Sequence, residues 1–138
     1  MTYISVEEAR EFTRNEVDAD AALVEVALLA ACRDIDNWCQ RTFTVPTSAT
    51  VRTFVPGLGS SLLRVPDIAN TTDLSISDDG TVLAAASYQL EVSPGQTNQT
   101  TRTGESWPYG YIRLLDSDWW TFDADRATVS VTARWGWP

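Results

Sequence analysis

The sequence predicts an α+β fold, with an N-terminal helical hairpin followed by an antiparallel β-rich region. Good helix formers dominate the first part of the chain. From Ala49 onward, short β-branched runs alternate apolar and polar positions between Gly and Pro residues. The length of 138 residues fits a single domain, with a helical part over 1–45 and a β-rich part over 46–138.

The first predicted helix is short and runs from Val6 to about Arg14. Ser5 and Glu8 have the spacing of a capping box, in which the hydroxyl and the carboxylate each bond a free backbone amide. Isolated helices of this length are marginal in water, so we expect this one to pack on the second helix. The connection over 15–20 supplies candidate caps for that second helix.

The segment Ala21–Cys32 predicts a long helix rich in Ala and Leu, in which Glu25 is the only polar side chain. A helix that is apolar on all sides has to be covered on all sides. The β-rich remainder offers little cover, so we expect part of it to come from another subunit. The side chains expected to be shared between the first helix and a neighbouring subunit are Leu23, Val26, Leu28 and Leu29.

Beyond Cys32 the same helix becomes amphipathic. The apolar positions include Trp38, which we expect in the core. The positions expected to face water are Glu25, Arg33, Asp36 and Gln40. Cys32 and Cys39 are separated by about 10 Å along a helix axis, too far for a disulfide, so we expect both to act as small buried apolar side chains.

Seven strands are predicted after the helices. Their ranges are Thr50–Val55, Leu62–Val65, Asp73–Ser77, Thr81–Leu83, Tyr88–Val92, Tyr111–Leu115 and Ala127–Arg134. The third and fourth are joined by Asp79-Gly80, a dipeptide that readily adopts the positive φ angles of a tight hairpin turn. The stretch from about 94 to 108 has little to bury and predicts an exposed loop.

The charge balance argues against a surface that grips nucleic acid. Ten basic residues against nineteen acidic ones give a net charge of −9 and a pI near 4.3. The first residues lack the pattern of a secretion signal, and Ala21–Cys32 is shorter than the roughly 20 apolar residues of a bilayer span. We therefore expect a soluble protein made in a cytoplasm, with no membrane partner.

Candidate catalytic groups are sparse. The chain contains no histidine, the commonest general base and transition-metal ligand, and no lysine for a phosphate-binding loop. The densest acidic run holds Asp116, Asp118, Asp123 and Asp125, but its spacing does not match a calcium loop. We expect no catalytic residue, no metal and no cofactor, and rank a hydrolase built on these carboxylates last.

Six tryptophans are many for this length. Trp119 and Trp120 cannot both point inward from an extended stretch, because neighbouring strand side chains face opposite ways. Aromatic side chains anchor interfaces, so we expect Trp119, Trp120, Trp135 and Trp137 at subunit contacts. The alternative is a carbohydrate-binding β module, in which exposed tryptophans stack on sugar rings.

The order of these segments resembles the head-to-tail connector, or adaptor, proteins of long-tailed bacteriophages. The residues that carry the likeness lie in Ile4–Arg10, the helix that ends at Ile35–Phe43, the region from Asp78 to Tyr88, and Val129–Pro138. Relatives are expected to continue with helical sequence after the final Trp-Gly-Trp-Pro stretch, whereas this chain ends at Pro138.

The resemblance implies a non-enzymatic virion protein at the head-tail junction. Members of that family form rings, commonly of twelve subunits, that join the portal to tail-side proteins and extend the DNA channel. It implies that helix contacts around the ring cover the apolar helix. DNA would pass the acidic subunits without being bound specifically. A contact around a closed ring is heterologous, with different surfaces meeting at each interface.

Overall fold

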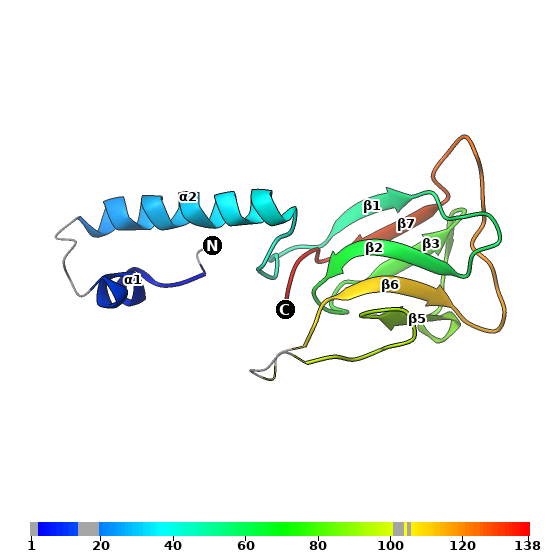
Figure 1. The fold of residues 1–138 in the computed structure, drawn as a ribbon. Coiled ribbons are helices and arrows are strands. Elements are labelled where there is room, and N and C mark those ends of the chain that lie inside the picture. Colours follow the sequence, from blue (N-terminus) through cyan, green and yellow to red (C-terminus); the bar gives the residue numbers. More distant parts are fainter. Residues whose placement is uncertain (1–2, 14–19, 101–103, 105) are drawn as a thin grey trace. The chain divides into compact units, whose positions relative to one another are not determined.

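The computed structural model describes residues 3–13, 20–100, 104 and 106–138. The chain divides into two compact units, Met1–Thr44 and Val45–Pro138 (Figure 1). The first is helical and the second consists of antiparallel sheets, which confirms the predicted α+β class. That the two parts make one domain stays a prediction.

The helical unit contains α1 (Val6–Phe12) and α2 (Ala21–Cys39). Both bonds of the predicted capping box are present: Ser5 N–H donates to Glu8 at 2.7 Å, and Glu8 N–H donates to the Ser5 hydroxyl at 3.1 Å. The predicted end of this helix, Arg14, lies outside the described residues. At the start of α2 the Asp20 carboxylate accepts the Ala22 N–H at 3.2 Å, as a capping residue from the predicted connection.

Over its described residues, the β unit contains seven strands, all paired antiparallel. They are β1 (Thr50–Phe54), β2 (Leu62–Ile68), β3 (Ser75–Asp78), β4 (Thr81–Val82), β5 (Tyr88–Glu91), β6 (Tyr109–Leu114) and β7 (Val129–Ala133), with a short 3-10 helix η1 (Ala85–Ser87) before β5. One sheet has the order β1-β7-β3-β4 and the other has the order β2-β6-β5. All seven strand predictions are confirmed, within a few residues at their ends.

Two local signals account for strand boundaries. The predicted hairpin turn between β3 and β4 has φ of 45° at Asp79 and 82° at Gly80, the left-handed geometry that the Asp-Gly pair favours. Strand β2 continues through Pro66 because it is an edge strand. The register shift between Arg64 and Ile68 accommodates this proline, which has no N–H for a ladder.

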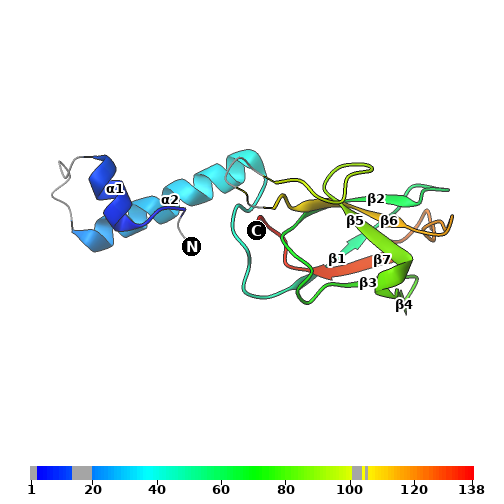
Figure 2. The ribbon, with the colours of Figure 1, turned by 90° about the horizontal axis from the view of Figure 1, so that it is seen from below.

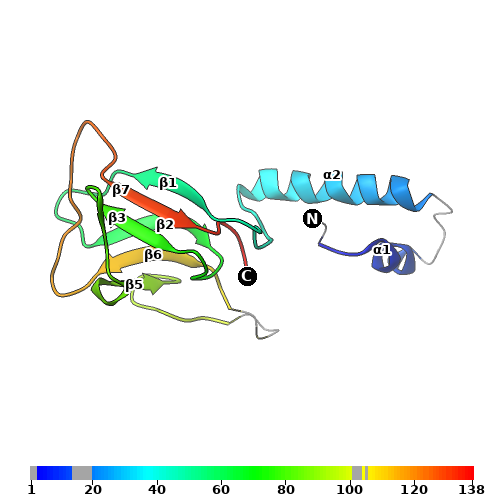
Figure 3. The same cartoon turned by 180° about the vertical axis from the view of Figure 1, so that it is seen from behind.

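The core of the β unit lies between its two sheets, which form separate layers in Figure 2 and are seen from opposite sides in Figures 1 and 3. In β7, Val129, Val131 and Ala133 are fully buried while the residues between them are half-buried, as strand alternation requires. The other members of the buried cluster are Leu63, Val65, Ile68, Ile76, Ile112, Leu114, Trp120 and Trp135. An isolated bridge between Ile68 and Trp135 links the two layers.

Candidate functional site: the uncovered face of helix α2

One face of α2 is covered within the helical unit. The row Val24, Leu28, Cys32 and Asp36 recurs every four residues and therefore lies along one side of the helix. Cys32 is only 7% exposed, and the other three are half-buried. We call these four residues the inner row.

The inner row is covered by residues that flank both helices. Tyr3 donates its N–H to Cys32 Sγ at 3.4 Å and its hydroxyl to Asp36 Oδ1, and Phe43 N–H donates to the same oxygen at 3.4 Å. The rings of Tyr3 and Phe43 meet edge to face with centroids 6.1 Å apart. Burial first, and then the bond to Asp36, raise the pKa of Tyr3 to about 12.

Asp36 therefore corrects one prediction. We expected this carboxylate on the water-facing side of the helix, but it is half-buried and accepts hydrogen bonds from two residues. The polar side chain is placed in the covered row because Tyr3 and Phe43 supply donors for it. A charged residue in a helix marks the wet face only when no partner covers it.

Opposite the inner row, the N-terminal half of α2 has an apolar face that the described residues leave exposed. Leu23, Val26, Ala27 and Ala30 follow the i, i+3, i+4, i+7 pattern of one helical stripe, and all four are exposed. Leu23 is 68% exposed and Val26 is 65% exposed. Nine residues separate Leu23 from Cys32, which at about 100° per residue places them on opposite sides of the helix. We call these four residues the outer stripe.

The two other predicted contact residues of this helix lie outside the outer stripe. Leu28 belongs to the inner row and is half-buried, and Leu29 is 36% exposed. The described part of the chain thus leaves Leu23, Val26 and Leu29 exposed, so the expected sharing of these side chains with a neighbouring subunit stays open.

Trp38 and Cys39 correct two further predictions. Trp38 is 90% exposed rather than part of the core, because two residues from Asp36 amount to about 200° around the helix, away from the covered row. Cys39 is exposed as well, so only Cys32 acts as a small buried side chain. The two thiols are free, as their predicted separation requires.

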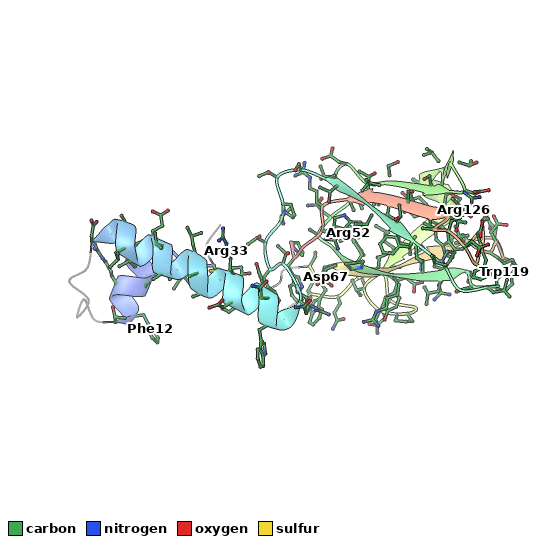
Figure 4. All side chains as sticks on the ribbon, turned by 90° about the horizontal axis from the view of Figure 1, so that it is seen from above. Phe12, Arg33, Arg52, Asp67, Trp119 and Arg126 are labelled. Atoms are coloured by element: carbon green, nitrogen blue, oxygen red, sulfur yellow. The ribbon has the colours of Figure 1, made fainter. Side chains whose placement is uncertain are left out.

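In the β unit, the tryptophan pair lies in the connection between β6 and β7 and divides into one buried and one exposed side chain. Trp120 is 2% exposed, and its indole N–H donates to the Ser61 carbonyl at 3.0 Å. Trp119 is 63% exposed and lies at one end of the unit (Figure 4). The chain itself already covers Trp120, which corrects its expected place at a subunit contact and leaves Trp119 available.

The two tryptophans near the C-terminus also make contacts within the β unit. Trp135 is 5% exposed, donates to the Thr50 carbonyl at 2.8 Å, and lies under the Arg52 guanidinium at 4.7 Å. This burial corrects its predicted place at an interface. Trp137 is half-buried, with its ring 5.1 Å from that of Trp107 and its indole N–H bonded to Asp67 at 3.0 Å.

The acidic run lies in exposed turns. Asp123 accepts the Asp125 N–H at 2.9 Å and pairs with Arg126 at 2.8 Å, and these two donors lower its pKa, the backbone N–H first. Arg126 also pairs with Asp79 at 2.8 Å. Across the residues that the structure describes, no cluster of three or more Asp, Glu, Cys or His side chains could hold a metal ion.

One buried ion pair was not predicted from the sequence. Glu91 is 0% exposed and accepts two bonds from Arg113, at 2.6 and 3.1 Å, together with the Gly95 N–H at 2.8 Å. Arg113 first, then the backbone N–H of Gly95, lower the pKa of the Glu91 carboxyl against the effect of burial. This pair fixes the first turn of the loop that follows β5.

The fold and these surfaces define an α+β protein whose helical unit exposes an apolar stripe. Comparisons with protein-family models, with curated proteins and with solved structures give no match for this chain. Over the parts of the chain that are described, no helix is both long enough and apolar enough to cross a bilayer.

Proposed function

We propose that this chain is a non-enzymatic structural subunit of a ring: a head-to-tail connector that joins a phage portal to tail-side proteins and extends the DNA channel. The observation that carries the proposal is the outer stripe of α2. Its four apolar side chains are exposed among the described residues of the helical unit, although the opposite face of the same helix is covered.

An apolar helix face left open to a neighbour suits a closed ring. In a heterologous contact, one surface of each subunit meets a different surface of the next, and the contact repeats until the ring closes. The outer stripe supplies one such surface. The net charge of −9 supports a channel that DNA passes without specific binding, as a location at the head-tail junction of the virion would require.

The alternative of a carbohydrate-binding β module loses part of its basis. It depended on exposed tryptophans, but Trp120 and Trp135 belong to the core. Trp119 is the strongly exposed member among those in the β unit. A single exposed ring offers less stacking surface than the predicted pairs.

The free energy of the proposed contact can be estimated from the exposed fractions of Leu23 and Val26. Full burial of a Leu or Val side chain contributes roughly 1.5–3 kcal/mol, and about two thirds of Leu23 and Val26 remains to be buried. The double substitution Leu23→Ser with Val26→Ser therefore removes about 2–4 kcal/mol from each subunit contact. That amounts to an association roughly 30–1000-fold weaker.

The test is electron microscopy combined with analytical ultracentrifugation of the full chain, alone and mixed with the portal protein of the same phage. We expect rings, and we expect the double variant to lose them while it keeps its helical circular dichroism. The matched control is Leu58→Ser, which removes an 80% exposed apolar side chain from the β unit. A chain that stays monomeric with and without portal would refute the proposal.

A further inference from the structure

A hollow of about 490 Å³ lies beside strand β5. It is lined by Tyr88, Gln89 and Leu90 of this strand, and around them by Thr71, Leu74, Ala85, Thr97 and Tyr109. Consecutive side chains of a strand point to opposite faces of the sheet, so a hollow bordered by three in a row lies along the strand's edge. None of the lining residues carries a charge.

The hydrogen bonds of the neighbouring residues show which backbone groups face this hollow. Antiparallel pairs alternate between bonded and non-bonded, and the bond from Leu115 N–H to Ser87 carbonyl at 2.9 Å makes this pair a bonded one. Along the register of β5 and β6, the backbone of Gln89 and Glu91 is then bonded to β6. The N–H and C=O groups of Tyr88 and Leu90 point away from β6, toward the open edge.

The next outward position on this edge is already used. Val92 N–H donates to the Gln96 carbonyl at 2.8 Å, so the chain returns on itself and pairs with its own edge there. This bond fits the alternation set by the bonded pair of Ser87 and Leu115, which makes Val92 an outward-facing residue like Tyr88 and Leu90. Within the described part of the chain, β5 pairs as a strand with β6 alone, which leaves the outward groups of Tyr88 and Leu90 without a strand partner.

We propose that the edge of β5 is a strand-addition site for an extended, uncharged peptide segment of a partner protein. Backbone bonds to Tyr88 and Leu90 supply the affinity, and the hollow receives a side chain of the added segment. The uncharged lining selects an uncharged segment, because an unpaired charge placed there loses its hydration without gaining a partner. The site belongs to the β unit and does not depend on the outer stripe of α2.

A lone segment fits this edge better than the edge of another sheet. The edge is recessed, since residues from the connection after β2 and from the loop after β5 border the hollow. Gln96 closes the tight turn that begins at Ser93 and accepts the Val92 N–H, so a backbone carbonyl of a neighbouring segment reaches this row of groups. Another edge strand, β1, offers a comparison, because its Val51 and Thr53 also have outward backbone groups but do not line the hollow.

The same alternation of bonded and non-bonded pairs shows which residues of β1 face outward. Asp79 N–H donates to the Thr128 carbonyl at 2.9 Å, which makes this pair a bonded one in the register of β3 and β7. In β7, Val129 and Val131 then bond β1. The intervening β1 residues, Val51 and Thr53, therefore point outward.

The test is an NMR titration of the full chain with the acetylated and amidated peptide Thr-Val-Ser-Val-Thr. We expect saturable shifts of the Tyr88 and Leu90 amides with a dissociation constant of about 1 mM, and no such shifts for Val51 and Thr53. The peptide Thr-Asp-Ser-Asp-Thr should give none. Unmoved Tyr88 and Leu90 amides at about 10 mM of the uncharged peptide would overturn the proposal, as would equal shifts at both edges.

A matched pair of variants tests the hollow itself. Ala85→Asp places a carboxylate in the lining and should weaken binding at least about tenfold, whereas Ala84→Asp adds the same charge at an exposed neighbour that does not line it. Equal effects of the two would contradict the site. If the Tyr88 and Leu90 amides shift as the protein concentration rises without any peptide, the occupant of this edge is a second copy of the chain. That result would overturn the proposal of a partner segment.

Discussion

Replacing each member of the Trp119–Trp120 pair by alanine should separate a core residue from a surface residue at adjacent positions. Trp120 is 2% exposed and bonded to Ser61, so Trp120→Ala removes a large buried ring and should cost about 3–5 kcal/mol of unfolding free energy. Trp119 is 63% exposed, and Trp119→Ala should change that free energy by no more than about 0.5 kcal/mol.

The assay is thermal unfolding of the β unit within the full chain, followed by near-ultraviolet circular dichroism and by tryptophan fluorescence. For a unit of this size, 1 kcal/mol shifts Tm by roughly 4–8 °C, so Trp120→Ala should lower Tm by at least about 12 °C. The milder Trp120→Phe keeps a ring, loses the bond to Ser61, and should fall between the two. Equal losses for Trp119→Ala and Trp120→Ala would refute the assignment of one side chain to the core.

Three further predictions concern ionisable groups and one turn. Because an arginine bond lowers the pKa of Glu91, its charge stabilises the fold above the ordinary value of 4.5, and this contribution is lost as the pH falls. Glu91→Gln should therefore flatten the decrease of Tm between about pH 5 and about pH 3 in calorimetry, and an unchanged slope would contradict the assignment. The pKa of Tyr3 is raised to about 12, so its bond to Asp36 stabilises the helical unit below pH 10 and is lost as the pH rises through 12. In an absorbance titration, Tyr3→Phe should remove the tyrosine that ionises last. Gly80→Ala forces a non-glycine residue to a φ of 82° and should cost about 1 kcal/mol in urea unfolding, whereas Gly57→Ala, with no positive φ, should cost less.

The features predicted well from sequence are those set by neighbours along the chain. The capping box joins Ser5 to a residue three positions away, and the Asp79-Gly80 turn depends on two adjacent residues. Alternation predicted that one of Trp119 and Trp120 turns inward. It did not identify which one, because that depends on the approach of Ser60 and Ser61 from a distant turn.

The features missed depend on contacts between distant residues. Asp36 looked solvated because its partner Tyr3 lies 33 positions away, and Trp38 looked buried because it continues an apolar pattern whose earlier members are covered, although Trp38 itself is 90% exposed. Glu91 lies in a strand beside Gln89, where a polar side chain ordinarily faces water. Its burial depends on Arg113, 22 positions further on, and no local pattern reports that pairing.

For the α2 surface, the sequence supplied the excess of apolar residues but not their division into two faces. The outer stripe and the inner row are interleaved, and either could have been the one that Tyr3 and Phe43 cover. The hydrogen bonds from Tyr3 to Cys32 and Asp36 determine which of the two faces is covered. The sequence alone therefore predicted a shared surface, and the structure identifies which side chains are available for it.

The edges of the two sheets also bear on how this protein behaves when concentrated. An open edge recruits the edges of other sheets into fibres unless something hinders this pairing, and three of the four edges among the described strands are hindered in this way. β4 has two residues, β2 carries Pro66, and β5 is recessed, so that it admits a single segment but not the edge of another sheet. β1, with five residues and no proline, is the edge where aggregation would begin, so a lysine at Thr53 is the first change to make in a stock prone to precipitate.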